Sequence, residues 1–183
     1  FAATEMAPSL AKMKNLKYLD LSNCNIRRKG GEVLGDSLKY LVHLVYLNLR
    51  ENNFKEFTVE RIAIGIKNSQ SLRYLDLSEN TMGDKGAKFI TQYLSSTNSM
   101  KRLYLANIDL STKSAKSLFA ALKKHDKLTV LDISDNNVDK VALNQLLNIV
   151  KDRNSFKTLL LHDNIIDCKN LLVKGQNLTF ECK

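Results

Sequence analysis

Hydrophobic and polar positions along this chain form a short motif that returns every 28 residues. The six copies begin at Leu16, Leu44, Leu72, Met100, Leu128 and Phe156. In the third copy, Leu75 and Leu77 alternate with polar neighbours, and this period of two predicts a short strand with one buried face. After the strand, Ala87, Ile90 and Leu94 follow at steps of three and four, which predicts an amphipathic helix.

Each unit is therefore expected to contain a strand, a turn and a helix, with Asp84 capping the helix of the third unit. One unit cannot bury its two thin apolar faces alone, so stacked copies must bury a continuous core between a strand layer and a helix layer. Helices are about 10 Å wide and strands about 4.8 Å apart, so the stack is expected to curve with the strands inside. Three columns of helix positions keep this phase: Leu34, Ile62, Ile90, Leu118 and Leu146; Leu38, Ile66, Leu94, Leu122 and Val150; and the small-residue column Gly31, Val59, Ala87, Ala115 and Leu143.

Each copy spells L-x-x-L-x-L-x-x-N/C-x-L, and the chain resembles leucine-rich repeat proteins over nearly its whole length. The 28-residue period and the segment Asn80–Ala87 are similar to the ribonuclease-inhibitor-like subfamily. The resemblance implies an α/β leucine-rich repeat solenoid, a horseshoe with parallel strands on the concave face and α-helices on the convex face. It implies no single activity, because members include enzyme inhibitors, activators of the small GTPase Ran, innate-immune sensor domains and actin-regulating or axonemal scaffolds.

The ninth motif position is expected to tie successive turns together. Asparagine there can bond backbone groups of adjacent turns and so satisfy polar atoms that the strand leaves behind. The column reads Cys24, Asn52, Asn80, Ile108, Asn136 and Asn164. We expect Cys24 to be a buried substitute and Ile108 to interrupt the ladder, with water or Asn107 taking over.

We predict a single domain over residues 1–183. Residues 1–15 form a partial repeat, residues 16–167 hold the six strand motifs, and residues 168–183 form a shortened closing unit in which Leu178–Phe180 repeats the strand alternation. Because the open end of a solenoid exposes core, the chain is expected to be a fragment of a longer protein, with a continuation or a packing partner at the N-terminal end.

The partial repeat is expected to be a helix. Projecting the period backward places Ala3, Met6 and Leu10 on the buried helix columns. Proline is tolerated in the first turn of a helix but breaks its interior, so Pro8 is expected in the first turn of a short helix.

Composition narrows the partner classes. The formal charge is +9, from 28 basic and 19 acidic residues, but the lysines are spread and mixed with acids, so nucleic-acid binding is not expected. The chain has no stretch of about 18 apolar residues, so no membrane span is predicted.

The cysteine count bears on the redox compartment, and the chain has three cysteines. Cys168 and Cys182 in the closing unit could form a disulfide, although a reduced pair in a cytoplasmic protein is favoured.

The sequence predicts no catalytic, cofactor or metal site. The histidines His43, His125 and His162 fall at different repeat positions, so none share a row on neighbouring strands. His162 precedes Cys168, but an open sheet offers no oxyanion donors and does not exclude water. We therefore do not expect an enzyme.

The strands are predicted to present three rows of side chains on the concave face. The rows read Tyr18, Tyr46, Tyr74, Arg102, Val130 and Thr158; then Asp20, Asn48, Asp76, Tyr104, Asp132 and Leu160; then Ser22, Arg50, Ser78, Ala106, Ser134 and His162. Tyrosine and arginine are enriched at interface hot spots, so the N-terminal half is the candidate site for a protein partner. Its candidate residues are Tyr18, Asp20, Tyr46, Asn48, Arg50, Tyr74, Asp76, Arg102 and Tyr104.

Tyr46 and Tyr74 are expected to face solvent, the acids to suit a basic partner segment, and Arg50 and Arg102 to be available for carboxylates. A second interpretation is that the tyrosines only stabilise the sheet by stacking. Another candidate surface is the lysine-bearing convex layer, with Lys67, Lys88, Lys116, Lys123, Lys124, Lys127 and Lys151.

The first functional hypothesis is a non-catalytic interaction or scaffold module in the cytoplasm, with cytoskeletal and axonemal scaffolds among its candidates. The alternative is a regulatory segment, either a GTPase activator of the Ran type or an innate-immune sensor, or a secreted pathogen effector.

Overall fold

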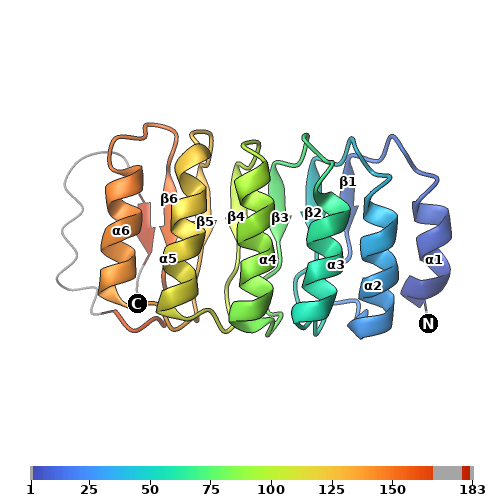
Figure 1. Ribbon diagram of the computed structural model, residues 1–183, viewed down its shortest axis with the longest axis horizontal. Helices are drawn as coiled ribbons and strands as arrows, with labels where there is room; N and C mark the ends of the chain where they lie inside the picture. Colours follow the sequence, from blue (N-terminus) through green and yellow to red (C-terminus); the bar gives the residue numbers. More distant parts are fainter. Residues whose placement is uncertain (1, 167–178, 182–183) are drawn as a thin grey trace.

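The computed structural model describes residues 2–166 and 179–181, which form a layer of strands covered on one face by a row of helices (Figure 1). All neighbouring strands are parallel and follow the chain order: β1 (Tyr18–Asp20), β2 (Tyr46–Asn48), β3 (Tyr74–Asp76), β4 (Arg102–Tyr104), β5 (Val130–Asp132), β6 (Thr158–Leu160) and β7 (Thr179–Glu181). The helices are α1 (Ala2–Leu10), α2 (Arg27–Leu38), α3 (Glu56–Ile66), α4 (Gly83–Ser96), α5 (Thr112–Ala121) with the 3-10 turn η1 (Leu122–Lys124), and α6 (Lys140–Val150). The predicted solenoid of strand, turn and helix is confirmed.

The strands pair in the predicted register. Leu19, Leu47 and Leu75 are direct partners, and the offset of one 28-residue unit persists to β6. β7 then pairs early, because Thr179 lies opposite Thr158. The strand predicted in the closing unit is thus confirmed, whereas Cys168 and Cys182 lie outside the described residues.

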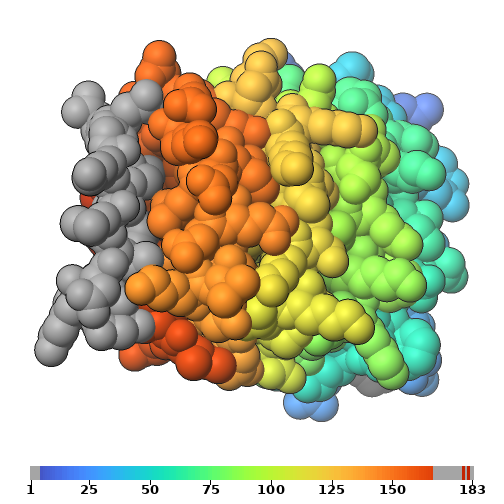
Figure 2. All heavy atoms as spheres, turned by 60° about the vertical axis from the view of Figure 1, so that its left-hand side comes forward, coloured from blue at the N-terminus to red at the C-terminus, as the bar shows by residue number. Residues whose placement is uncertain are grey.

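The core lies between the two layers. All members of the three predicted helix columns are buried, and the inward leucines of the strands are buried with them. Helices pack mainly on the helix before and the helix after in the chain. Figure 2 shows the helix side as successive bands in chain order, so each repeat borders the repeats next to it in sequence.

The ninth-position asparagines clamp successive turns. The Asn80 Oδ1 atom accepts hydrogen bonds from the backbone N–H groups of Asn52 and Phe54, each at 3.0 Å. Its Nδ2 atom donates to carbonyl oxygens of its own repeat and of the preceding repeat. Asn52 and Asn136 repeat this pattern at buried positions, so buried backbone groups of consecutive repeats are satisfied by one side chain.

At two positions of this ladder the expectation is tested, and it is wrong for Cys24 and partly right for Ile108. Cys24 is exposed, and its thiol donates to the Ser22 carbonyl at 3.3 Å within its own turn, because no described turn packs on it from the N-terminal side. Ile108 is fully buried and does interrupt the ladder. Asn107 does not take over, because its Nδ2 atom donates to Glu79 Oε2 at 2.6 Å on the surface.

Asp84 does not cap its own helix, contrary to the prediction. Helix α4 begins at Gly83, one residue earlier, and the Met82 side chain provides no cap. The Asp84 carboxylate instead accepts from the Ser111 backbone N–H at 2.9 Å and from the Ser111 hydroxyl at 2.7 Å. Since Ser111 caps α5, Asp84 links the starts of two neighbouring helices.

Helix α1 differs from the projected pattern. Pro8 lies in its last turn and not its first, with its ring exposed, so the helix loses one internal hydrogen bond but no packing. Met6 is 36% exposed while Ala7 is 1% exposed, so the buried face is rotated by one residue. Leu10 is buried as predicted.

In the part of the chain that the structure describes, no helix is long and apolar enough to cross a membrane.

The contact between α2 and α3 generates a first prediction. A Cβ atom on Gly65 would lie 2.2 Å from the Gly35 carbonyl oxygen and 3.0 Å from the Leu38 Cβ atom. Glycine to alanine in a helix interior ordinarily stabilises by about 1 kcal/mol, but here the two helices must move apart. Gly65→Ala is expected to lower the free energy of unfolding by about 2 kcal/mol in a denaturant titration. A variant as stable as wild type would contradict this close approach.

The clamp generates a second prediction. Asn136→Ala removes a buried amide that bonds the backbone of two repeats and leaves those backbone groups unsatisfied. We expect a loss of about 3 kcal/mol in the free energy of unfolding, measured by urea denaturation. Ile165→Ala is the control, because Ile165 is 65% exposed and should cost about 0.5 kcal/mol or less. Equal losses would show that the clamp does not stabilise the stack.

Candidate partner-binding face

Four tyrosines form a stack on the face of the sheet that the helices leave uncovered, here called the open face. Ring centroids are 4.0 Å apart for Tyr18 and Tyr46 and 4.1 Å apart for Tyr46 and Tyr74, with the planes 8° and 18° from parallel. Tyr104 joins Tyr74 in a tilted contact at 5.1 Å. In-register parallel strands place equivalent side chains about one strand spacing apart, so the rings meet face to face. We call Tyr18, Tyr46, Tyr74 and Tyr104 the tyrosine stack.

The rings of the stack differ in exposure. Tyr18 at the end is 59% exposed, whereas Tyr46, Tyr74 and Tyr104 are only partly exposed because neighbouring rings cover them. Burial raises the pKa of the Tyr74 hydroxyl, so it stays protonated at neutral pH. The expectation that Tyr46 and Tyr74 face solvent holds only for the ring edges.

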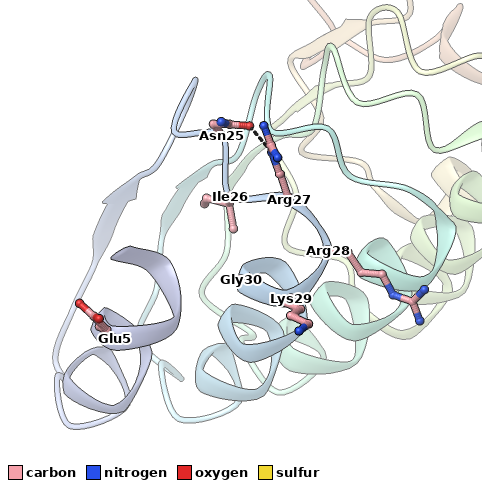
Figure 3. A pocket seen from close by; sticks show the side chains of 7 residues that line it. All are labelled: Glu5, Asn25, Ile26, Arg27, Arg28, Lys29 and Gly30. Carbon is pink, nitrogen blue, oxygen red and sulfur yellow. Dashed lines mark hydrogen bonds between the residues drawn. The ribbon is translucent and has the colours of Figure 1, made fainter. Parts of the chain in front are cut away.

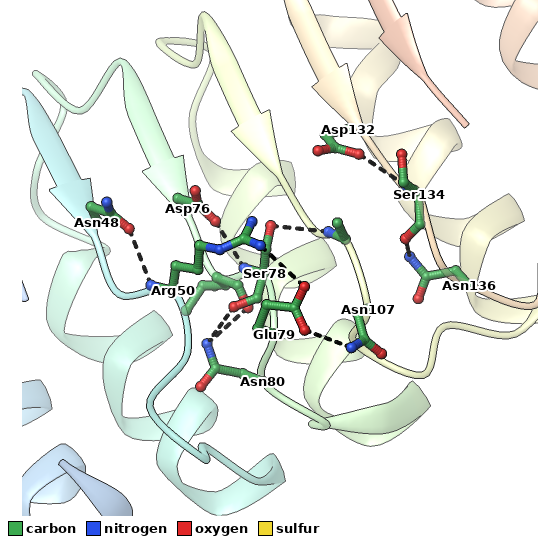
Figure 4. A network of polar contacts seen from close by, with 12 residues as sticks. Asn48, Arg50, Asp76, Ser78, Glu79, Asn80, Asn107, Asp132, Ser134 and Asn136 are labelled. Carbon is green, nitrogen blue, oxygen red and sulfur yellow. Dashed lines mark hydrogen bonds and ion pairs between the residues drawn. The ribbon is translucent and has the colours of Figure 1, made fainter. Parts of the chain in front are cut away.

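Acidic and amide side chains of the middle row turn back onto their own strand ends. Asp76 and Asp132 each accept the backbone N–H of the serine two residues later, at 2.9 Å (Figure 4). Both carboxylates are buried, and burial raises the pKa of Asp76, so its carboxylate is not free to pair with a basic partner. Asp20 is exposed, and its second oxygen accepts from Asn48 Nδ2 at 3.1 Å.

The two arginines of the candidate set differ in whether a carboxylate of this chain already pairs with them. Arg50 Nη2 lies 3.1 Å from Glu79 Oε1, and the other Glu79 oxygen accepts from Asn107, so this arginine already has a carboxylate (Figure 4). Arg102 lies beside Tyr74 in the register and is exposed. Among residues 2–166 and 179–181, no hydrogen bond or ion pair engages its guanidinium.

Where Tyr104 replaces an acid or amide, the missing acceptor comes from the neighbouring strand. The Ala106 backbone N–H donates to the Ser78 hydroxyl at 3.1 Å.

The C-terminal half of the open face carries smaller or apolar side chains, Val130, Thr158 and Leu160. There the His162 Nε2 atom lies 3.4 Å from Glu181 Oε2. The structure therefore brings the aromatic candidates together in the N-terminal half.

The sequence reasoning missed a basic column at the rim where the strands begin, here called the rim column. A continuous series of backbone hydrogen bonds of 2.8–2.9 Å links its residues: Lys17, Val45, Arg73, Lys101, Thr129 and Lys157. The signal was present in the sequence as the residue after the first leucine of each motif.

The opposite rim, the turn column, is acidic. Its residues all have a positive φ of 49–58°: Asn23, Glu51, Glu79, Asn107, Asp135 and Asp163. Desolvation and the nearby Asp163 raise the pKa of the Asp135 carboxyl, which indicates crowded negative charge. The open face thus has positive charge at one rim and negative charge at the other.

The described residues hold no candidate metal cluster at this face or elsewhere. No group of three or more His, Cys, Asp or Glu side chains among them could hold a metal ion. A cavity of about 860 Å³ lies near the N-terminal end and is lined by Glu5 and residues 25–30 (Figure 3). Arg27 is bonded to Asn25 there, while Arg28 pairs with Glu32 and lies over the Phe57 ring.

Comparison with known proteins agrees with this geometry. The family model described as Leucine Rich repeat matches residues 12–35, 68–90 and 125–143. The chain is a leucine-rich repeat solenoid. Search by sequence found no curated protein that matches it. The likeness to the ribonuclease-inhibitor-like subfamily remains a resemblance.

Solved structures share the fold at low sequence identity. Leiomodin-1 Actin-Binding Site 2 has a TM-score of 0.65 at 15% identity, covering 83% of this chain and 87% of that one. Internalin C2 from Listeria monocytogenes has a TM-score of 0.58 at 16% identity, covering 100% and 92%. The tropomodulin C-terminal domain of Caenorhabditis elegans has a TM-score of 0.56 at 10% identity, covering 88% and 83%.

The stack generates a third prediction. Tyr46 stacks on both sides, so Tyr46→Ser should cost about 2 kcal/mol of unfolding free energy, while Tyr18→Ser, which loses one stacking partner, should cost about 1 kcal/mol. Tyr40→Ser is the control, because Tyr40 is 47% exposed and stacks on no described tyrosine, so its cost should be about 0.5 kcal/mol or less. Thermal and urea denaturation measure all three. Equal costs at Tyr46 and Tyr40 would show that the stack contributes nothing to stability.

Proposed function

We propose that this chain is a non-catalytic protein-interaction module that binds a protein partner through the open, concave face of its sheet. The tyrosine stack is the observation that carries the proposal. Tyrosine offers a large apolar area with a polar tip and few rotatable bonds. Because neighbouring rings already hold each other in place, binding orders few further side chains and loses little entropy.

The residues around the stack supply polar contacts of both signs. Asp20 is exposed at the Tyr18 end, and Arg102 is exposed beside Tyr74 without a described partner. Asn48 and Arg50 are held in place by local hydrogen bonds and offer fixed polar edges. We propose that these N-terminal strands make most of the contact, since the C-terminal strands carry smaller or apolar side chains.

Actin is the first partner to test. One solved structure with this fold is described as an actin-binding site, that of leiomodin-1. The likeness in sequence is low, so it supports the choice of probe and not a shared site. A cytoskeletal scaffold in the cytoplasm is the setting that this partner would imply.

The test is co-sedimentation with actin filaments, comparing wild type with two matched double variants. Tyr18→Ser/Arg102→Ser changes a tyrosine and a cation on the open face, while Tyr40→Ser/Lys88→Ser changes the same types elsewhere. All four side chains are exposed, so both variants should stay folded by circular dichroism. We expect the open-face variant to bind at least about 10-fold more weakly, because hot-spot truncation costs more than about 1.4 kcal/mol, and the control to stay within about 2-fold.

Each contrary result has a distinct meaning. If both variants bind like wild type, the open face is not the binding site. If wild type does not co-sediment, actin is not the partner, and the same pair of variants is used for affinity capture from cell extracts. A captured protein retained by the control variant and lost by the open-face variant would then identify the partner.

A further inference from the structure

Four cations lie on the open face or along its basic rim, and no carboxylate among the described residues pairs with them. Lys17, Lys101 and Lys157 belong to the rim column, and Arg102 lies on the open face itself. All four side chains are exposed. Arg73 of the same column differs, because its guanidinium donates to the backbone carbonyls of Gln70 and Leu72.

The acids of the open face lie further from the stack or are already engaged. In each repeat the rim column immediately precedes the first row, whereas the turn column follows it by five residues, beyond the middle and last rows. Of the turn-column acids, Glu79 is paired with Arg50 and bonded by Asn107. Of the acids nearest the stack, Asp20 is exposed but accepts hydrogen bonds from Ser22 and Asn48. Asp76 is buried. Away from the Tyr18 end, a partner seated on the tyrosines therefore meets unpaired positive charge first, and the overall charge of +9 adds a long-range attraction for acids.

We infer that the open face takes an acidic protein segment that lies along the tyrosine stack, across the strands. Its carboxylates pair with the rim column and Arg102, and its apolar or aromatic side chains rest on the tyrosine rings. This inference rests on the proposed function, because it names the chemistry of the partner at that same face. If the carboxylates of the segment faced the turn column instead, they would lie against the acids of that column, and the repulsion between like charges disfavours this placement.

The spacing of the cations suits such a segment. Lys101 and Lys157 are separated by two strand steps, which is about 10 Å. Carboxylates three residues apart on a segment in the polyproline II conformation share one face and lie about 9 Å apart, and those seven residues apart on a helix share one face and lie about 10.5 Å apart. The Arg102 guanidinium can in addition hold a carboxylate through two parallel hydrogen bonds.

The test uses a defined probe, the random copolymer of glutamate and tyrosine in a ratio of about 4:1, with fluorescence anisotropy as the readout. Lys101→Glu/Arg102→Glu reverses two cations at the stack. Lys88→Glu/Lys124→Glu reverses two exposed cations on the helix side, so both variants lower the formal charge by four from +9. Poly-glutamate and poly-lysine are measured beside the copolymer.

We expect the Lys101/Arg102 variant to bind the copolymer at least about 10-fold more weakly and the Lys88/Lys124 variant to stay within about 3-fold of wild type. Wild type should prefer the copolymer to poly-glutamate and should not bind poly-lysine. Equal losses in both variants would mean attraction to net charge alone, and preference for poly-lysine would mean the opposite partner class. Either result overturns the inference.

A third variant, Tyr18→Ser, separates this inference from the proposed function. If Tyr18→Ser weakens binding of the copolymer and the charge reversal at Lys101 and Arg102 does not, the open face binds but its partner is not selected by acidity. If neither change weakens binding, the open face is not the site and both proposals fail. Circular-dichroism melts confirm that every variant compared is folded.

Discussion

The asparagine clamp between successive turns is the interaction on which the rest of this structure depends. A strand of three residues forms few ladder hydrogen bonds, and the backbone then turns away with polar groups that water does not reach. The Asn80 side chain satisfies backbone groups of two repeats at once. The clamps act together with the packing of the buried columns, which keeps the register across the unclamped fourth repeat, and so equivalent side chains line up on the open face.

The fourth repeat departs from this pattern at several positions that lie together. Ile108 replaces the clamp, Tyr104 replaces the polar residue of the middle row, and Arg102 ends the first-row run of tyrosines. On the surface of the same turns, Asn107 donates to Glu79, and Glu79 pairs with Arg50. The same repeat carries the adjacent cations at the end of the tyrosine stack. Its departures thus exchange a standard buried turn for an open face with both aromatic rings and unpaired charge.

Periodicity was sufficient to predict the fold, the core columns and the strand register, because each depends on spacing alone. It was not sufficient for contacts that cross between repeats. Asp84 was expected to cap its own helix, yet it bonds Ser111 of the next repeat. Tyr46 was expected to face solvent, yet neighbouring rings cover it.

The candidate site was predicted in part for the same reason. Alternation identified Tyr18, Tyr74 and Arg102 as side chains of the inner rows, and the structure places them in register. The rim column was missed because its residues precede the alternating run, and only the backbone ladder shows that Lys17 and Lys101 belong to one series. Burial of Asp76 could not be read from the sequence, since an acid of the same row, Asp20, is exposed.

The most direct test of the account is hydroxyl-radical footprinting of the tyrosines, with and without a bound protein partner. Tyr18 and Tyr40 are similarly exposed in the free chain, at 59% and 47%, so Tyr40 serves as the internal control. The account predicts that binding lowers oxidation of Tyr18 and the rest of the stack, while oxidation of Tyr40 is unchanged. Unchanged oxidation of Tyr18 in the bound chain would contradict it and place the partner on another surface.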